Sequence, residues 1–265
     1  DFLLWRNRPE VILELLPDAR KVIDGCRSWL KNGLLSVPEW NFIDWVDCWN
    51  NGVPPEPGGG CTLNWLFVLA LQKMAGMEEY FGHPSAPYLK LAENLKTAIR
   101  RNYYHRERRL YAESRDLKHY SEHAQLLALL AAPDPELREA FRSAKNLPPA
   151  GIYFSYYYLE ACYQQRLPEL FAARLGKWFG LEGQGLKTLP EKFENPRSDC
   201  HAWSAHPLHH YFASLLGVRP AAFGFREIRI APLAGIYPRL GGVMPHPDGL
   251  IGVEIEEGKV DYQAP

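Results

Sequence analysis

The fold class is decided by residues 121–179, which read SEHAQLLALLAAPDPELREAFRSAKNLPPAGIYFSYYYLEACYQQRLPELFAARLGKWF. Apolar side chains recur in this stretch at helical spacing, and breaks rich in proline or glycine divide it into segments. Helices are predicted at 121–131, 135–144, 154–165 and 168–179. Short helices joined by short connections favour antiparallel helical hairpins.

The same helical pattern extends toward the N-terminus. Helices are predicted at 9–31, where Pro17 is expected to kink or split the helix, and at 61–81 and 88–103. Between the first two lies a loop over 34–60 that is rich in proline, glycine and tryptophan. Loops of this length are commonly functional. A short hairpin or bend is predicted at 106–115.

The sequence changes character after the last predicted helix, at about 199–216. Gly217 ends that helix, and alternating apolar and charged residues follow at 225–231. Two further strands flank a turn at Glu257-Gly258, which predicts a small antiparallel β unit. The predicted architecture is therefore mainly α, with a helical domain at 1–217 and a β portion at 218–265.

Composition excludes several classes of protein. The chain has 265 residues, with 46% hydrophobic and 23% charged residues, which is typical of a soluble globular protein. Its 30 basic and 31 acidic residues give a net charge of -1, so neither nucleic acid nor an anionic membrane is an expected partner. The five cysteines lie apart without a CxxC pair, which indicates neither a disulfide framework nor a zinc ribbon. No apolar stretch is long enough to span a bilayer.

Aromatic residues make up 13% of the chain and often lie beside carboxylates or histidines. Two interpretations stay open at this point. The rings either fill a large core, or they cover the apolar faces of a bound sugar.

One dense polar and aromatic segment is Trp40-Asn-Phe-Ile-Asp44-Trp45-Val-Asp47-Cys-Trp49, within the predicted loop. Two interpretations of this loop stay open. Either its aromatic rings are buried and fix the loop, with the carboxylates in solvent, or the rings form a surface that binds a sugar, with the carboxylates bound to its hydroxyl groups.

A second dense segment runs over 188–206 and contains Glu191, His201 and Trp203. Ser198 or Asp199 could cap the following helix, but capping does not explain the other three residues. We interpret this segment as functional.

The histidine pairs His119/His123 and His206/His210 have the i, i+4 spacing of zinc ligands on one helix face. Without an HExxH motif, structural or hydrogen-bonding roles are favoured. Motifs for a serine nucleophile or for phosphate and dinucleotide binding are absent from the sequence. No cofactor and no metal are expected.

Taken together, five segments resemble the catalytic region of α-L-rhamnosidase-like enzymes of glycoside hydrolase family 78. They stand in the family's order and are followed at once by the β unit. The segments are Phe42-Ile-Asp-Trp45, Phe154-Ser-Tyr-Tyr-Tyr-Leu-Glu-Ala161, Thr188-Leu-Pro-Glu191, Arg197-Ser-Asp-Cys-His-Ala-Trp-Ser-Ala-His-Pro207 and Gly224-Phe-Arg-Glu-Ile-Arg-Ile-Ala-Pro232.

The resemblance implies an (α/α)6 barrel, a following β-sandwich and inverting hydrolysis of terminal α-L-rhamnosides, with a carbohydrate as the partner. Glu191 matches the family's water-activating base, and His201 matches a histidine that binds the sugar. Trp45 corresponds to an aromatic wall of the sugar pocket. Asp44 and Trp203 are expected to bind substrate beside these residues.

The chain also departs from the family pattern. Pro190 stands where the family usually has tryptophan, and the segment between Glu191 and His201 is short. The family's general acid lies in an Arg-Asp-Glu cluster upstream of the region matched here, and about eight predicted helices fall short of the twelve in a closed barrel. We therefore expect an incomplete barrel from a longer protein, with the acid upstream and with low activity of this chain alone. The compartment stays open.

Two other functions remain possible on this reading. One is an inverting glycosidase from another (α/α)6 family, with Asp44 or Glu113 as acid and a different sugar. The other is a carbohydrate-binding protein without catalysis.

Overall fold

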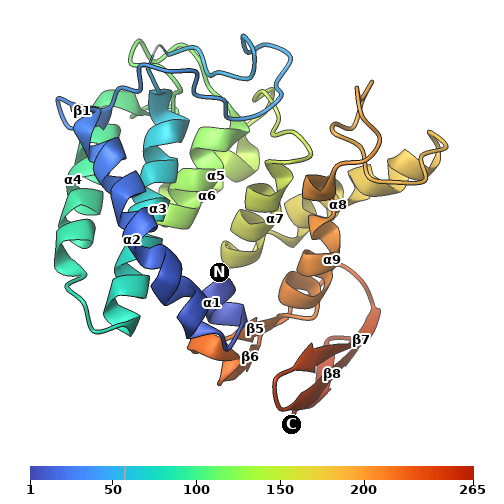
Figure 1. The fold of residues 1–265 in the computed structure, drawn as a ribbon. Coiled ribbons are helices and arrows are strands. Elements are labelled where there is room, and N and C mark those ends of the chain that lie inside the picture. The colour runs from blue at the N-terminus through green and yellow to red at the C-terminus, as the bar shows by residue number, and fades with distance from the viewer. Residues whose placement is uncertain (57) are drawn as a thin grey trace. The chain divides into compact units, whose positions relative to one another are not determined.

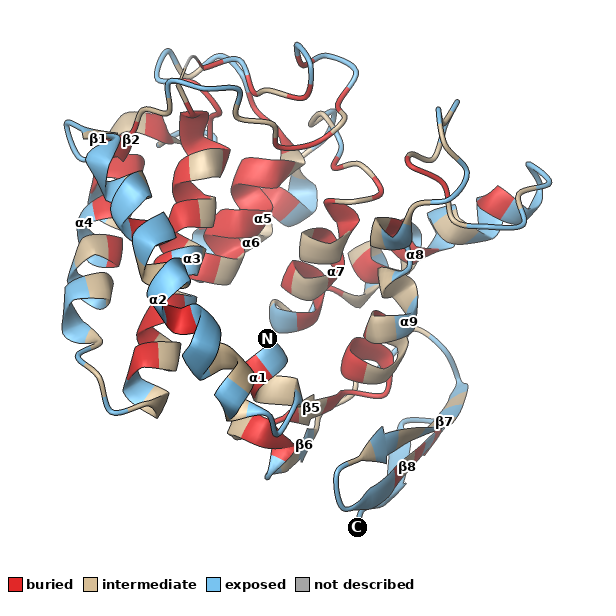
Figure 2. Ribbon diagram, viewed as in Figure 1, coloured by how far each residue is buried: buried red, intermediate tan, exposed pale blue. Residues whose placement is uncertain are grey.

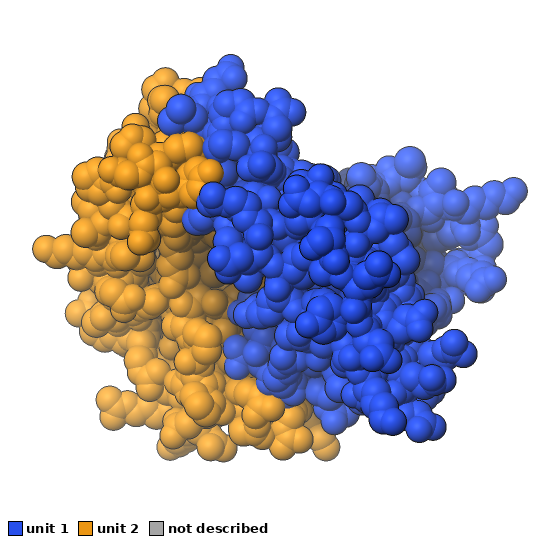
Figure 3. All heavy atoms as spheres, turned by 90° about the horizontal axis from the view of Figure 1, so that it is seen from below, with its two compact units in different colours: residues 1–14, 162–265 blue, residues 15–161 orange. Residues whose placement is uncertain are grey.

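The computed structural model of the chain describes residues 1–56 and 58–265 (Figure 1). Pro57, in the tail of the predicted loop, lies outside the described residues. The chain forms two compact units, one of residues 15–161 and the other of residues 1–14 together with 162–265 (Figure 3).

The unit of residues 15–161 is helical. It contains most of α2 (Pro9–Ser28) and all of α3 (Gly60–Tyr80), α4 (Ala86–Tyr103), α5 (Glu122–Ala131) and α6 (Pro135–Ser143). Helix α3 packs against α4 and α5, and α5 packs against α6. Figure 2 shows that α3 and α5 are the most buried of these helices, because both are apolar on most sides.

Two short hairpins lie at helix ends in this unit. After α2, β1 (Leu30–Lys31) pairs with β2 (Leu34–Leu35), and after α4, β3 (Tyr104–His105) pairs with β4 (Leu110–Tyr111). The second pair confirms the predicted hairpin. Pro17 does not split its helix, since α2 runs unbroken through this position on an exposed face.

The N-terminal ends of α3 and α5 meet at Glu113, which is fully buried. Its carboxylate accepts hydrogen bonds from Thr62 Oγ1 (2.7 Å) and from the Thr62 backbone N–H (3.3 Å), and also from the Ser121 hydroxyl. Ser121 is in turn the N-cap of α5. A carboxylate at two helix N-termini is favourable because the exposed N–H groups there carry partial positive charge.

The unit of residues 1–14 and 162–265 combines helices and strands. Its helices are α1 (Phe2–Trp5), the end of α7 (Ser155–Gln164), α8 (Pro168–Glu182) and α9 (His206–His210), with a π-helical turn at Tyr211–Leu215. Its strands are β5 (Val218–Pro220) paired with β6 (Ile228–Ile230), and a three-stranded antiparallel sheet of β7 (Arg239–His246), β8 (Gly249–Glu256) and β9 (Lys259–Gln263). Leu216, Val218, Phe225, Ile251 and Val253 form the core between the last helical turn and these strands.

The last helix is shorter than predicted. Residues 199–201 are irregular, a 3-10 turn spans Ala202–Ser204, and α9 begins only at His206. Pro207 fits the first turn of a helix, where no N–H is needed, and so favours a start at this point. The prediction of a helix from residue 199 was wrong in this respect.

Strand β7 was not predicted, because Gly241, Gly242 and Pro245 weaken its β pattern. In the structure, pairing with β8 over eight residues stabilises the strand.

The described residues contain nine α-helices, where six hairpins require twelve. The domain boundary predicted at Gly217 stays a prediction. In the described part of the chain, no helix has both the length and the apolar character needed to cross a membrane.

Candidate active site

The loop between β2 and α3 folds back on itself around Gly52. The backbone carbonyl of Gly52 accepts a hydrogen bond from the Ile43 N–H (2.9 Å), and Gly52 has φ +73°. A Cβ at this position would overlap the Phe42 ring and would lie 2.9 Å from the Asp44 carbonyl oxygen. Glycine is therefore required where the two arms of the loop meet.

Asp44 anchors this loop to the helices of its unit. The residue is 1% exposed, and its Oδ2 accepts from the Gly151 N–H (2.7 Å) and shares a hydrogen bond with His123 Nε2 (2.8 Å). Its Oδ1 accepts from the Trp45 N–H (2.9 Å). A buried carboxylate with this many protein partners holds its loop in place.

Trp45 follows the anchor directly and is half-buried. Its ring centroid lies 4.9 Å from that of Phe42 at an angle of 60°. Two packed rings on an anchored loop give a preformed apolar surface of the kind that covers a sugar ring.

His123, at the start of α5, is fully buried between two rings, with centroid distances of 4.6 Å to Trp49 and 4.4 Å to Phe154. His119 is exposed and precedes the helix, so the pair His119/His123 does not share a helix face. The favoured structural role of His123 is confirmed by its bond to Asp44.

The other unit carries the second predicted segment, in which two short stretches pair through their backbones. Glu191 N–H donates to the Ser198 carbonyl (2.9 Å), and His201 N–H donates to the Leu189 carbonyl (2.7 Å). The Ser204 hydroxyl donates to the Pro190 carbonyl (2.9 Å). These bonds fix the backbone on both sides of Glu191.

Glu191 is 4% exposed and its carboxylate is held by Arg197. Arg197 Nη2 lies 2.5 Å from Oε1, and Arg197 Nε lies 3.1 Å from Oε2, which is a two-pronged contact. The Arg197 hydrogen bonds, aided by the charges of Arg197 and His201, lower the pKa of Glu191 below its usual value. Glu191 is therefore a carboxylate at neutral pH.

His201 and Trp203 complete this cluster. Their ring centroids lie 4.7 Å apart at 37°, and Trp203 Nε1 donates to the Glu191 carbonyl (3.3 Å). Both residues are half-buried. Within the described residues, the buried Nδ1 of His201 has no hydrogen-bond partner.

The structure thus brings Glu191, His201 and Trp203 together in one unit and places Asp44 beside Trp45 in the other. Sequence reasoning assigned no role to Arg197, although a basic residue six positions from the expected base is a usable signal. It also missed the bonds of Asp44 to His123 and Gly151, because these residues are far apart in the chain.

Comparison with known protein families gives a match over residues 7–215 to the bacterial alpha-L-rhamnosidase 6 hairpin glycosidase domain. No curated protein matches the chain significantly by sequence.

Solved structures share the fold. A family 78 rhamnosidase of Bacillus sp. GL1 aligns with 98% of this chain at a TM-score of 0.85 and 22% identity. A Streptomyces avermitilis α-L-rhamnosidase in complex with L-rhamnose aligns with 96% of it at 0.74 and 15%. A Klebsiella oxytoca rhamnosidase with rhamnose bound aligns with 74% of it at 0.63 and 20%.

This chain spans 30%, 26% and 41% of the lengths of those three chains, in the same order. The resemblance to glycoside hydrolase family 78 is confirmed, and the helices fit an incomplete (α/α)6 set of hairpins. Since the family domain matches residues 7–215, the chain belongs to the bacterial α-L-rhamnosidase six-hairpin glycosidase family.

Proposed function

We propose that this chain carries the base half of an inverting α-L-rhamnosidase, in which Glu191 activates the water that attacks a terminal α-L-rhamnoside. The observation that carries the proposal is the ionised, backbone-fixed Glu191 carboxylate grouped with His201 and Trp203. A general base must be unprotonated and fixed in position, and Glu191 meets both conditions.

The chemistry requires two carboxyl groups on opposite sides of the sugar. The base takes a proton from water as the water attacks the anomeric carbon, and an acid protonates the leaving oxygen. Arg197 keeps Glu191 charged but also covers it. Because the Arg197 side chain is 68% exposed, its guanidinium can turn aside into solvent and let water or sugar reach the carboxylate.

Sugar binding is assigned to the aromatic and imidazole groups. Trp203 and Trp45 offer apolar ring faces, and the half-buried His201 imidazole offers a hydrogen bond to a hydroxyl. Asp44 is buried, so we propose that it serves substrate binding through the loop that carries Trp45. Rhamnose as the substrate is supported by family membership and by the two related structures that contain it.

The general acid is proposed to come from outside these 265 residues. Asp44 and Glu113, the two carboxylates considered for this role, are 1% and 0% exposed and are engaged with protein donors. A sealed carboxyl group does not reach a leaving oxygen, so neither residue supports an acid within this chain.

The test uses an aryl α-L-rhamnoside with a good leaving group, which needs no protonation. Glu191→Gln should lower its turnover by about 10²–10⁴-fold, the usual contribution of a general base. Glu194→Gln is the matched control, because Glu194 is an exposed carboxylate in the same loop. Equal activity of wild type and Glu191→Gln would reject Glu191 as the base.

A second substrate with a poor leaving group locates the acid. If the acid lies outside the chain, only the good leaving group departs. Comparable turnover of both substrates would place the acid within these 265 residues.

A carbohydrate-binding protein without catalysis is the second candidate, because both Glu191 oxygens are engaged by Arg197. It predicts rhamnose binding that survives Glu191→Gln, together with no turnover of either aryl rhamnoside.

A further inference from the structure

A concentration of positive charge lies among residues to which no role is assigned above. Residues 100–109 read RRNYYHRERR, with five arginines and one glutamate, in a chain whose net charge is -1. The segment comprises the end of α4, the strand β3 and the turn toward β4.

This segment lines an open, concave surface within the unit of residues 15–161. The cavity measures about 700 Å³ and is lined by Arg100, Arg101, Tyr104, Arg106 and Arg109, with Glu136 from α6. Its size falls within the range of small-molecule sites, about 300–1,000 Å³. The lining carries four positive charges and one negative charge.

Most of this positive charge is not neutralised by the protein. Arg100 is occupied, since its Nη1 lies 3.5 Å from Asp134 Oδ2 and its guanidinium covers the Tyr104 ring at 4.5 Å. Arg101, Arg106 and Arg109 are exposed, and none of the described carboxylates lies within ion-pair distance of them.

Helix stabilisation explains only part of this arrangement. Arg100 and Arg101 lie in the last turn of α4, where positive charge complements the helix dipole. Arg106 and Arg109 lie in the hairpin turn beyond the helix, where that effect has faded. Like charges held around one concavity repel one another, and an anionic ligand would relieve the repulsion.

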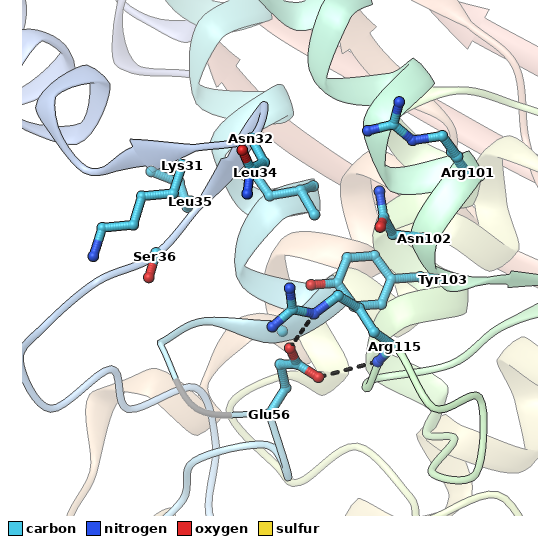
Figure 4. Close-up of a pocket in the computed structure, with 11 residues that line it drawn as sticks. Lys31, Asn32, Leu34, Leu35, Ser36, Glu56, Arg101, Asn102, Tyr103 and Arg115 are labelled. Atoms are coloured by element: carbon cyan, nitrogen blue, oxygen red, sulfur yellow. Dashed lines mark hydrogen bonds and ion pairs between the residues drawn. The ribbon is translucent and has the colours of Figure 1, made fainter.

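A second cavity shares Arg101 with the first. It measures about 320 Å³ and lies between the β1–β2 hairpin and the end of α4 (Figure 4). Glu56 and Arg115, which both line this cavity, are paired with each other: Glu56 accepts hydrogen bonds from Arg115 Nε (2.6 Å) and from the Arg115 N–H (3.0 Å). Lys31, Asn32 and Ser36 supply further polar groups.

We propose that these two cavities form an accessory site for an acidic oligosaccharide. Carboxylates of uronic acid residues pair with Arg101, Arg106 and Arg109, for which the planar guanidinium is well shaped. Hydroxyl groups of the neighbouring sugar occupy the second cavity, where amide, ammonium and hydroxyl groups line the wall. The choice of a glycan rests on the proposed function.

The polar second cavity favours a glycan over a nucleic acid. A nucleic acid would need an extended basic field along its backbone, and the chain as a whole carries a net charge of -1. The basic surface is instead local, next to groups that bind hydroxyls.

Isothermal titration calorimetry on the purified chain tests the site. The probe is a hexamer of galacturonic acid, and its fully methyl-esterified form is the neutral counterpart. The acidic hexamer should bind and weaken at high salt, because exposed charge pairs are screened. The esterified hexamer should bind at least about tenfold more weakly, the loss expected from several missing charge pairs.

The double variant Arg101→Gln/Arg106→Gln should raise the Kd for the acidic hexamer by about tenfold. The matched control is Arg27→Gln/Arg142→Gln, since these arginines also lie in last helical turns but line neither cavity. Its Kd should stay near that of the wild type. Thermal unfolding of both double variants verifies that they are folded.

Equal binding of the acidic and esterified hexamers, or an unchanged Kd in Arg101→Gln/Arg106→Gln, would overturn the proposal. Equal affinity for a single-stranded oligonucleotide of similar charge would also overturn it, by showing a general polyanion surface. The readout is independent of turnover. Binding that depends on Arg101 and Arg106, in a chain that hydrolyses no rhamnoside, would refute the proposed function and leave the accessory site standing.

Discussion

Arg197 controls the charge of Glu191 and hence the acid limb of the pH profile. Because Arg197 lowers the pKa of Glu191, the proposed base remains ionised as the pH falls below the usual glutamate range. In Arg197→Gln that pKa rises, so kcat/KM on a good-leaving-group rhamnoside should begin to fall at a higher pH than in the wild type.

The conservative variant Arg197→Lys keeps a positive charge but loses the planar fork, and should give an intermediate acid limb. Identical acid limbs in wild type, Arg197→Lys and Arg197→Gln would show that Arg197 does not act on the base.

Gly151 leaves no room for a side chain beside Asp44. A Cβ at Gly151 would lie 2.8 Å and 3.0 Å from the two carboxylate oxygens, so Gly151→Ala must displace Asp44 or the backbone. Overpacking of this kind should lower the free energy of unfolding by about 1–3 kcal/mol.

Gly25→Ala is the matched control, because a Cβ at Gly25 meets no atom within 4 Å in the helix α2. Alanine there should stabilise the chain by about 0.5–1 kcal/mol. Urea unfolding measures both variants, and a Gly151→Ala midpoint equal to that of the wild type would contradict the close contact.

Residue-scale contacts were predictable only where they are local. Glu191, His201 and Trp203 lie within one short segment, and their grouping could be read from the sequence. Asp44 contacts His123 and Gly151, which lie 79 and 107 positions away. No local pattern reports such pairs, so the burial of Asp44 could not be predicted from the sequence.

At the scale of elements, Glu78 joins three helices. From α3 it accepts from Arg20 of α2 at 2.8 Å and 2.6 Å and from Tyr88 of α4 at 3.1 Å. These bonds, chiefly those of Arg20, lower the pKa of Glu78 to about 2 although burial opposes the shift. These bonds therefore stabilise the ionised form of Glu78.

Stability should therefore depend on pH through Glu78. Its folded pKa lies below its unfolded value of about 4.3, so the contribution is complete above that pH and is lost as the pH falls toward 2. Arg20→Gln should cost about 2 kcal/mol near neutral pH and flatten this acid dependence.

Chemical unfolding of wild type and Arg20→Gln between pH 2 and pH 6 measures the effect. Lys96→Gln is the control, because its partner Glu93 is 69% exposed and such pairs contribute at most about 1 kcal/mol. Parallel pH curves for wild type and Arg20→Gln would refute the role of Glu78.

Helices were the most predictable elements because their apolar spacing is local. The patterns over 61–81 and 88–103 gave α3 and α4 within about two residues, the usual uncertainty of helix ends. The start of α9 depended on Pro207, and the formation of β7 depended on pairing with β8. The apolar pattern of a single segment reports neither effect.

At the scale of the whole molecule, α2 presents an unusual apolar surface. Leu15 and Val22 lie seven positions apart in α2 and are 55% and 66% exposed, and Trp29, which is 36% exposed, follows directly after the helix. Apolar groups aligned along one helix face favour association. We expect the chain to self-associate as its concentration rises, and light scattering measures this directly.

Val22→Lys should reduce that association by placing a charge between Leu15 and Trp29. Val243→Lys is the control, since Val243 is 61% exposed and lies on β7, not on α2. A wild-type chain that stays monomeric at all concentrations would contradict the expectation.

We propose that Glu191 activates water in an inverting hydrolysis. Proton NMR of the first product formed from a good-leaving-group aryl α-L-rhamnoside tests it most directly, because the anomers are distinguishable before they equilibrate. We expect β-L-rhamnose as the initial product in wild type and Glu194→Gln, with little product from Glu191→Gln. Initial release of α-L-rhamnose would show a retaining reaction through a covalent intermediate and would contradict the role assigned to Glu191.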